Sequence, residues 1–280
     1  MLNSVPIRVP ATTANLGPGY DALGVALQIY NFVTVRRGAA ADAHPMAIEA
    51  SGIFFKAAGL APFAFDWSIK GDVPRSRGMG SSVTVRLGLL HGLNELAGHP
   101  LDPPRLFEIC AQLEGHPDNA APAAFGGFTV AGGPQIARFA VEPELRFILL
   151  IPDFEIATPD ARRALPAAID RLGAARSCAN ACRITAAFAA QNYELLRGAF
   201  EDHLHQPYRE KALIPFLTAV ISAGEKAGAL GGFLSGSGST ICCVTFDHAE
   251  AVAAAMLAAS GNAGARTVIT TADNTGVQRL

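Results

Sequence analysis

Two glycines and three serines stand in the segment Pro74-Arg-Ser-Arg-Gly-Met-Gly-Ser-Ser-Val-Thr84, which leads into a predicted helix. Glycine lets a backbone turn tightly and approach a ligand closely. Apolar residues recur at helical spacing from Ser82 to Gly98, and the free N–H groups at the start of such a helix favour a phosphate group. The serine hydroxyls can bond phosphate oxygens or a hydrated Mg²⁺ ion. Taken alone, the segment is equally compatible with a Gly-Ser turn and an ordinary helix cap.

Two common phosphate-binding motifs do not fit this segment. A Walker-type loop requires a lysine directly after its last glycine, and Ser81 follows Gly80 instead. A dinucleotide-binding fingerprint requires glycine or alanine where Val83 stands, and an acidic residue at the end of a strand about 20 residues later. Asp102 stands at that distance, but in a Leu-Asp-Pro-Pro loop. Both motifs are therefore excluded.

A second glycine-rich segment lies nearer the N-terminus, directly after a predicted strand. Pro10-Ala-Thr-Thr-Ala-Asn-Leu-Gly-Pro-Gly-Tyr-Asp-Ala-Leu-Gly24 carries the amide of Asn15 and the carboxylate of Asp21. Polar groups on a stiff loop suit the recognition of a small molecule. The alternative is a turn in which both side chains only cap the local backbone.

Three further groups of residues stand out. Glu114-Gly-His-Pro-Asp-Asn119 places two carboxylates, an imidazole and an amide within six residues, just beyond a predicted helix. Gly231-Gly-Phe-Leu-Ser-Gly-Ser-Gly-Ser-Thr240 is another Gly/Ser loop, which on its own is equally compatible with a flexible turn. His203 and His205 lack a third metal ligand nearby, so they are interpreted as part of a surface helix face.

The composition is that of a globular chain with little net charge. The 280 residues include 22 Lys and Arg and 24 Asp and Glu, a net charge of −2, and 50% are hydrophobic. Such a chain has no overall attraction to nucleic acid or to anionic membranes. Five cysteines without a C-x-x-C pair argue against a disulfide framework or a zinc ribbon. No secretory signal is visible from Met1 to Gly17, so a cytoplasmic location is expected.

Patterns along the chain predict two α+β domains, residues 1–145 and 146–280. In the first domain, strands are predicted at 5–10, 29–35 and 67–69, and helices at 82–98 and 107–113. In the second, a strand at 147–151 precedes a helix-rich stretch from 159 to 230, broken at Pro207 and Pro215. A glycine-rich break at 231–238, a strand at 241–246, a helix at 249–259 and a strand at 268–271 follow.

Taken together, these segments resemble the GHMP kinase superfamily, named for its galacto-, homoserine, mevalonate and phosphomevalonate kinases. Pro74–Thr84 is similar to its phosphate loop, usually Pro-x-x-x-Gly-Leu-Gly-Ser-Ser-Ala. Within the superfamily the homoserine kinases are the most similar, because Val9–Gly24 matches their opening motif almost letter for letter. Their other motifs follow in family order as Glu114–Asn119, Thr158-x-x-x-Arg-Arg-x-Leu-Pro166, Asp202-x-x-His-Gln-Pro-Tyr-Arg209 and Gly228-Ala-x-Gly-x-x-Leu-Ser-Gly-Ser-Gly238.

This resemblance implies a fold and an activity. The fold would be the GHMP kinase fold, with an N-terminal domain like ribosomal protein S5 domain 2, a ferredoxin-like C-terminal domain and the site between them. The activity would be ATP-dependent and Mg²⁺-dependent phosphorylation of the L-homoserine hydroxyl to O-phosphohomoserine, on the route to threonine. A homodimer is expected by resemblance only. Two alternatives remain open: a GHMP kinase for another small hydroxy compound, and a catalytically silent relative that binds nucleotide.

The resemblance also implies residue roles at the nucleotide end of the site. Ser82 and Glu114 would contact Mg²⁺, and backbone amides of the phosphate loop would hold the triphosphate. The implied nucleotide-binding residues are Pro74, Arg75, Ser76, Arg77, Gly78, Met79, Gly80, Ser81, Ser82, Val83 and Thr84. Met79 stands where the family usually has leucine, and the two side chains have similar volumes. No asparagine stands in 51–56, where many relatives place one near the base, so relaxed nucleoside specificity is expected.

At the acceptor end, homoserine is a zwitterion with a hydroxyl group. Asp21, with Asn15 beside it, would bind the ammonium group, and Arg163 and Arg209 would bind the carboxylate. His116 and Asn119 would lie near the hydroxyl. Asp118 stands where mevalonate-type relatives have a catalytic aspartate, but a route without a base, in which the hydroxyl loses its proton towards the γ-phosphate, is favoured. The implied catalytic residues are therefore His116, Asp118, Asn119, Arg163 and Arg209.

Overall fold

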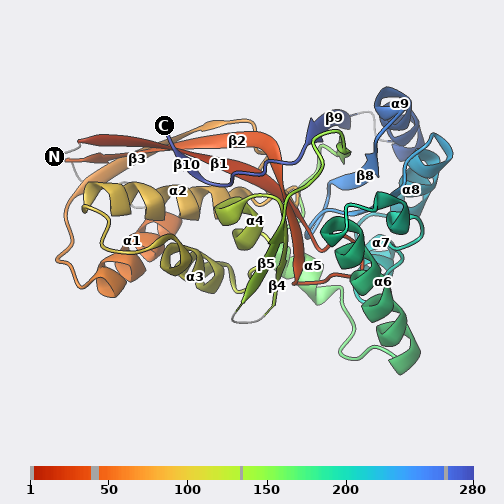
Figure 1. Ribbon diagram of the computed structural model, residues 1–280, viewed down its shortest axis with the longest axis horizontal. Coiled ribbons are helices and arrows are strands. Elements are labelled where there is room, and N and C mark those ends of the chain that lie inside the picture. The colour runs from red at the N-terminus through yellow and green to blue at the C-terminus, as the bar shows by residue number, and fades with distance from the viewer. Residues whose placement is uncertain (1–2, 39–43, 133–134, 262–263) are drawn as a thin grey trace.

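A computed structural model describes residues 3–38, 44–132, 135–261 and 264–280. The chain forms two halves that lie side by side, each built on one antiparallel sheet (Figure 1). The C-terminus lies on the first half, beside β1. Of the helices that the structure describes, none is long and apolar enough to cross a membrane.

The first half combines a six-stranded sheet with four helices. Its strands run in the order β10-β1-β2-β4-β5, and β3 pairs with β2. The strands are β1 (Ser4–Ala14), β2 (Leu23–Arg37), β3 (Phe65–Gly71), β4 (Phe128–Ala131), β5 (Ile136–Phe139) and β10 (Gln278–Arg279). The helices are α1 (Pro45–Ala58), α2 (Ser81–Leu96), α3 (Pro103–Glu114) and α4 (Ala120–Phe125). Because β10 pairs with β1, the last residues of the chain return to the first sheet.

Helix α2 lies against the first sheet and fixes the position of the phosphate loop that precedes it. Gly88 and Gly92 are four residues apart and therefore share one face of the helix. A Cβ atom on either glycine would come within 2.5 Å of Val33 or Val35 in β2, so the missing side chains allow the helix to approach the sheet closely. The apolar residues of α2 are buried in the first core, which leaves its N-terminus directed at the loop.

The second half has the ferredoxin-like arrangement that the resemblance implies. Its elements are β6 (Arg146–Ile151), α5 (Thr158–Arg163), α6 (Arg171–Ala189), a 3-10 turn (Tyr193–Leu196), α7 (Gln206–Ala212), α8 (Leu217–Lys226), β7 (Gly231–Leu234), β8 (Ile241–Thr245), α9 (Ala249–Ser260) and β9 (Arg266–Thr271). The sheet order is β7-β8-β6-β9. After Arg146, strand β6 is apolar because Ile148 and Leu150 pack towards α8 and α9, while Phe147 and Leu149 face the other core.

A shared core joins the two halves. Leu23 and Phe128 of the first sheet pack with Phe147 of the second sheet and with Phe188 of α6. The rings of Phe128 and Phe188 are stacked with their centroids 4.2 Å apart. The halves are therefore held together by apolar packing close to the place where the polar loops meet.

Several predicted boundaries are wrong, and three of them have a clear physical reason. Strand β1 continues beyond Pro10 to Ala14, because residues 11–14 pair with the start of β2. Residues 231–234 are not part of a break but form β7, which pairs with β8. Pro207 lies in the first turn of α7 and does not break a helix, since the first turn needs no proline N–H.

Candidate active site

The phosphate loop between β3 and α2 is shaped by close backbone contacts. Gly78 and Gly80 have φ angles of +69° and +66°, a left-handed conformation that glycine adopts at little cost. A Cβ atom on Gly78 would lie 2.1 Å from the carbonyl oxygen of Ser235, and one on Gly80 would lie 2.2 Å from Thr12 Oγ1. No side chain caps the first turn of α2 in the described structure, which leaves its N–H groups for an anion.

Two other polar loops hold this one in place. Ser235 Oγ donates a hydrogen bond to the Gly78 carbonyl oxygen at 2.7 Å, and Asn15 Nδ2 donates to the Gly236 carbonyl oxygen at 2.9 Å. The backbone N–H of Thr240 donates to the carbonyl oxygen of Arg77. The three glycine-rich segments of the sequence thus form one cluster in the structure.

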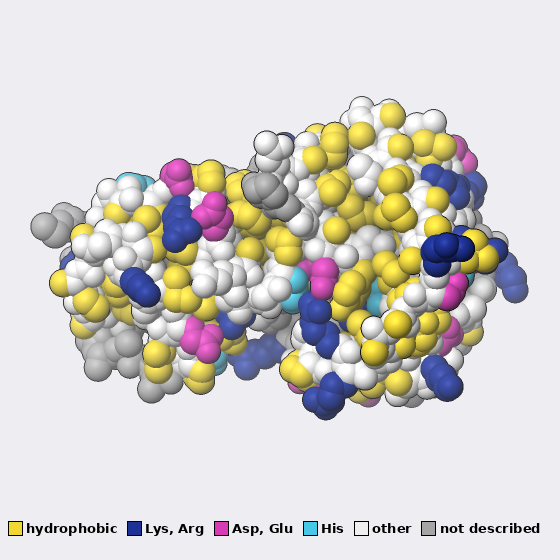
Figure 2. All heavy atoms as spheres, turned by 90° about the horizontal axis from the view of Figure 1, so that it is seen from below, with side chains coloured by type: hydrophobic (Ala, Val, Ile, Leu, Met, Phe, Trp, Pro, Cys, Tyr) yellow, Lys and Arg dark blue, Asp and Glu magenta, His cyan; other side chains and the backbone are white. Residues whose placement is uncertain are grey.

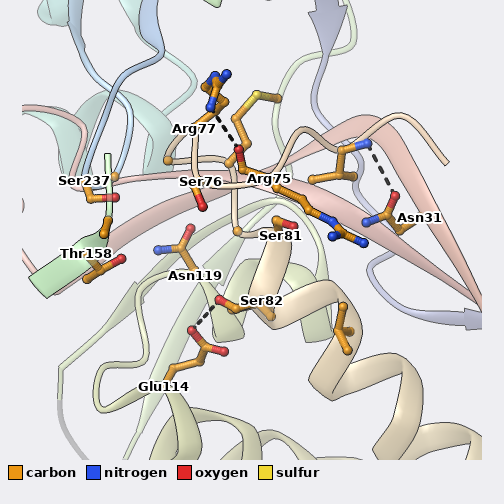
Figure 3. A pocket seen from close by; sticks show the side chains of 18 of the residues that line it. Asn31, Arg75, Ser76, Arg77, Ser81, Ser82, Glu114, Asn119, Thr158 and Ser237 are labelled. Atoms are coloured by element: carbon orange, nitrogen blue, oxygen red, sulfur yellow. Dashed lines mark hydrogen bonds between the residues drawn. The ribbon is translucent and has the colours of Figure 1, made fainter. Parts of the chain in front are cut away.

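Ser82 and Glu114, the predicted magnesium contacts, lie together in the cleft (Figure 3). Ser82 Oγ donates to Glu114 Oε2 at 2.8 Å, and Arg86 Nη1 lies 2.6 Å from Glu114 Oε1. A hydroxyl and a carboxylate are the hard oxygen donors that Mg²⁺ prefers, so this pair fits the ion. Arg86 holds the carboxylate in position and limits its freedom to turn away.

The His116–Asn119 segment forms a network around one oxygen of Asp118. His116 Nδ1 lies 2.6 Å from Asp118 Oδ1, and the same oxygen accepts the Asn119 backbone N–H at 2.9 Å. The hydrogen bond to Asp118 raises the pKa of His116. Thr12 Oγ1 donates to Asn119 Oδ1 at 2.7 Å, which orients the amide. Asp118 is buried and serves as an anchor for both of its neighbours.

Asp21 faces an arginine of α5, but not the one that the sequence predicted. Arg162 Nη2 lies 3.0 Å from Asp21 Oδ1, and Arg162 Nη1 donates to the Tyr20 hydroxyl at 2.9 Å. Arg163 points away: its side chain is 75% exposed and pairs with Asp160 on the same helix. Successive helical residues point about 100° apart, so Arg163 leaves α5 in a different direction from Arg162.

The loop that carries Asp21 has an unusual backbone. Asn15 and Asp21 have φ angles of 70° and 55°, a left-handed conformation that asparagine and aspartate tolerate better than most residues. Asn15 Oδ1 accepts the backbone N–H of Asp21 at 3.0 Å, so the amide fixes the carboxylate's position. This is the local reason why these two residue types stand here.

Arg209 of α7 is a buried guanidinium held by neutral groups. Its Nε donates to the Ala161 carbonyl oxygen at 3.2 Å, and its Nη1 donates to the Gly236 carbonyl oxygen at 2.8 Å and to His205 Nδ1 at 3.2 Å. Burial lowers the pKa of Arg209. Among the described residues, Nη2 has no hydrogen-bond partner and no carboxylate forms an ion pair with this arginine. The site is therefore suited to an anion.

One cavity of about 460 Å³ is lined by most of the predicted site residues. The predicted residues in its wall are Asn15, Asp21, Arg75, Ser76, Arg77, Gly78, Met79, Gly80, Ser81, Ser82, Val83, Glu114, His116, Asp118, Asn119 and Arg209. Pro74, Thr84 and Arg163 are outside it. Thr84 is buried and donates to the Ser81 carbonyl oxygen, a helix-stabilising contact. Figure 2 shows acidic, basic and histidine side chains meeting between the two halves.

Several wall residues are absent from the predicted set. Arg162 and Thr158 could have been found, because both lie in the Thr158–Pro166 motif. His44, Trp67 and Lys70 also line the cavity, and nothing in the local sequence pattern marks them. Arg77 lines the cavity, but its guanidinium donates to the carbonyl oxygens of residues 152 and 153, so its role is to tie the loop to the second half.

The fold and site define a class of protein that comparison with known families identifies. Residues 45–127 match the family model "GHMP kinases N terminal domain", and residues 184–263 match "GHMP kinases C terminal". The chain is similar to the homoserine kinase of Trichormus variabilis, with 38% identity over 290 aligned residues that cover 96% of each chain. It is 37% identical to the homoserine kinase of Clostridium botulinum strain Eklund 17B over 256 residues, 86% of each chain.

A solved structure agrees with the sequence relatives. The crystal structure of homoserine kinase from Cytophaga hutchinsonii superposes with a TM-score of 0.90 and 24% identity, over 100% of this chain and 98% of that one, which shows the shared fold. The chain belongs to the homoserine kinase family of GHMP kinases. The predicted family, fold class and kinase activity are confirmed, and none of these matches favours the two alternatives.

Proposed function

We propose that the protein transfers the γ-phosphoryl group of ATP to the side-chain hydroxyl of L-homoserine. The observation that carries this conclusion is the pair of opposite charges, Asp21 and the buried Arg209, in the wall of the same cavity as the phosphate loop. An amino acid with a terminal hydroxyl can bind both charges and still present its oxygen to the phosphate. Mevalonate and neutral sugars lack the ammonium group that Asp21 would bind.

The ion pair between Asp21 and Arg162 prepares the site for a zwitterion. The two side chains are 34% and 41% exposed, and such a pair contributes about 0–1 kcal/mol. Homoserine would replace it: its ammonium group would bind Asp21, and its carboxylate would bind Arg162 together with Nη2 of Arg209. Each hydrogen bond to a charged group contributes about 1.5–3 kcal/mol, so the exchange favours substrate binding.

Ser82 and Glu114 would hold Mg²⁺ at the start of α2. The bound ion would neutralise charge on the phosphate oxygens while the transferred group is between donor and acceptor. The backbone N–H groups of residues 78–82 would hold the triphosphate, and the tight packing of Gly78 against Ser235 fixes their direction. These contacts would orient the γ-phosphoryl group towards the acceptor, which would be the main contribution of the protein to phosphoryl transfer.

The chemical step proceeds without a general base. The homoserine hydroxyl oxygen attacks the γ-phosphorus, the bond from that phosphorus to the ADP oxygen breaks, and the hydroxyl proton passes to an oxygen of the transferred phosphoryl group. Oδ1 of Asp118 accepts from His116 and from the backbone N–H of Asn119. Its role in this scheme is to hold these two side chains beside the hydroxyl.

An ADP-release assay with a panel of acceptors tests this function. L-Homoserine should support turnover, while mevalonate, shikimate and galactose should support little. Efficient turnover of any of these three in place of homoserine would refute the assignment. ATP binding without turnover of any acceptor would instead identify a silent relative, although such a protein has no need for the charges at the acceptor end.

We also propose the biological setting that the family resemblance implies. The product, O-phospho-L-homoserine, would enter threonine biosynthesis, and the enzyme would work in the cytoplasm as a homodimer. The near-neutral net charge of −2 argues against nucleic acid as a partner. Light scattering of the purified protein tests the dimer, since a monomeric mass at micromolar concentration would contradict it.

A further inference from the structure

His205 is a buried imidazole that the proposed reaction does not use. It directly precedes α7, its side chain is inaccessible to solvent, and it does not line the cavity. The prediction that it belongs to a surface helix face is therefore wrong. Its ring instead lies between two parts of the acceptor site, the loop that carries Asp21 and the guanidinium of Arg209.

The hydrogen bonds of His205 determine which ring nitrogen carries the proton. Nε2 lies 2.8 Å from the carbonyl oxygen of Gly17, which can only accept, so Nε2 must donate. Nδ1 lies 3.2 Å from Arg209 Nη1, which can only donate, so Nδ1 must accept. Only the neutral ring with its proton on Nε2 satisfies both partners.

The surroundings keep the ring in this state. Burial lowers the pKa of His205 to about 4, and the nearby charge of Arg209 acts in the same direction, while Asp202 opposes it. Asp202 Oδ2 lies 3.5 Å from Nε2 and also accepts the backbone N–H groups of His205 and Gln206, which fixes the start of α7. The ring of Tyr20 lies 5.3 Å away, centroid to centroid.

We propose that His205 is a positioning residue for the substrate carboxylate, acting through Arg209. By accepting from Nη1, it turns the guanidinium so that Nη2 remains free for a ligand. By donating to Gly17, it couples that guanidinium to the loop that carries Asp21. The two charged groups that would bind a zwitterion are thereby held at a fixed separation. This inference rests on the proposed function, because it requires Arg209 to bind a carboxylate.

Two substitutions separate the two hydrogen bonds. His205→Asn places an amide oxygen near the position of Nδ1 and can still accept from Arg209. His205→Gln reaches the position of Nε2 and can still donate to Gly17, but it offers Arg209 no acceptor at the position of Nδ1. His203→Gln is the matched control, because His203 is nearby in sequence, partly exposed and outside the cavity wall.

The readout is the ratio of kcat/KM for L-homoserine to that for 3-aminopropan-1-ol, which lacks only the carboxylate. His205→Gln should lower this ratio about tenfold or more, the loss expected for one hydrogen bond to a charged group, with the KM for ATP unchanged. His205→Asn should stay within about threefold of wild type, and His203→Gln should equal it. Combined with Arg209→Lys, His205→Gln should cause little further loss, because both act on one contact.

The outcomes distinguish this proposal from the proposed function. If the wild-type enzyme uses both acceptors equally well, the carboxylate assignment itself fails. If the wild-type enzyme prefers L-homoserine and His205→Gln keeps the same kcat/KM ratio between the two acceptors, the role of His205 is refuted while the carboxylate assignment stands. A measurement on the wild-type protein does not depend on how the variants fold: ¹⁵N NMR of the imidazole should show the neutral Nε2–H form near neutral pH. A proton on Nδ1 would overturn the proposal.

Discussion

Arg162 and Arg163 are neighbours in the chain, and the structure assigns them opposite roles. Arg162 faces Asp21 in the cavity wall, whereas Arg163 is 75% exposed and pairs with Asp160. Replacing each arginine by methionine removes the charge and keeps much of the apolar stem. Arg162→Met should raise the KM for homoserine, and Arg163→Met should leave it unchanged.

The size of the effect follows from the geometry. A hydrogen bond to a charged group contributes about 1.5–3 kcal/mol, and the partial exposure of Arg162 places its contribution at the lower end of that range. Substrate must also displace the existing pair with Asp21, which offsets about 0–1 kcal/mol. About 1–2 kcal/mol remains, and this corresponds to a rise in KM of about five- to thirtyfold.

Initial rates at saturating ATP and Mg²⁺ measure this directly, with homoserine and 3-aminopropan-1-ol as alternative acceptors. For the acceptor without a carboxylate, Arg162→Met should leave kcat/KM unchanged or increase it, because Asp21 no longer has a competing partner. An unchanged homoserine KM in Arg162→Met would refute the reasoning. An equal rise in Arg163→Met would do the same, since that side chain does not reach the cavity.

Three further predictions concern other parts of the site. Arg209→Lys keeps the charge but not the set of hydrogen bonds, so the homoserine KM should rise about tenfold or more while ATP affinity stays constant; initial rates and calorimetry check this. Gly78→Ala should abolish ATP binding in calorimetry, because its Cβ would lie 2.1 Å from the Ser235 carbonyl oxygen, whereas Gly98→Ala, also at positive φ but in open space, should not. The pKa of His116 is raised in the folded protein, so its protonated ring stabilises the fold. This contribution to the free energy of unfolding is complete below the unfolded-state pKa of about 6.5 and is lost as the pH rises through the folded-state pKa. Urea unfolding should therefore show wild type losing this advantage over His116→Gln above about pH 6.5, and parallel pH profiles would contradict it.

Local sequence was enough where a structural feature depends on consecutive residues. The glycine-rich turn before α2 could be predicted because its glycines, its serines and the start of the helix are adjacent in the chain. The same holds for the segment from Glu114 to Asn119, whose side chains meet through contacts between near neighbours. The helix at Ala249–Ser260 was also predicted closely, since its alanine-rich pattern and Gly261 mark both ends.

Local sequence was not enough where tertiary contacts decide. The Arg162-Arg163 pair gives no sign of which side chain faces inward, because that depends on where α5 lies against the first half. In the sequence, the glycines of β7 look like a break between elements. In the structure they form a strand that pairs with β8, and a Cβ atom on Gly232 would lie 2.6 Å from Cys243 Sγ. The burial of His205 likewise depends on Gly17, which is 188 positions away in the chain.

The charges that would bind a zwitterion come from different halves of the molecule. Asp21 lies on the loop between the first two strands, whereas Arg162 and Arg209 belong to helices of the second half. Their separation is therefore set by the shared core, where Phe128 and Phe188 stack, and by the link from His205 to Gly17. A rigid separation between opposite charges selects for an amino acid more strongly than either charge alone. A chain with almost no net charge can thus recognise a small zwitterion, because recognition depends on where a few charges are fixed.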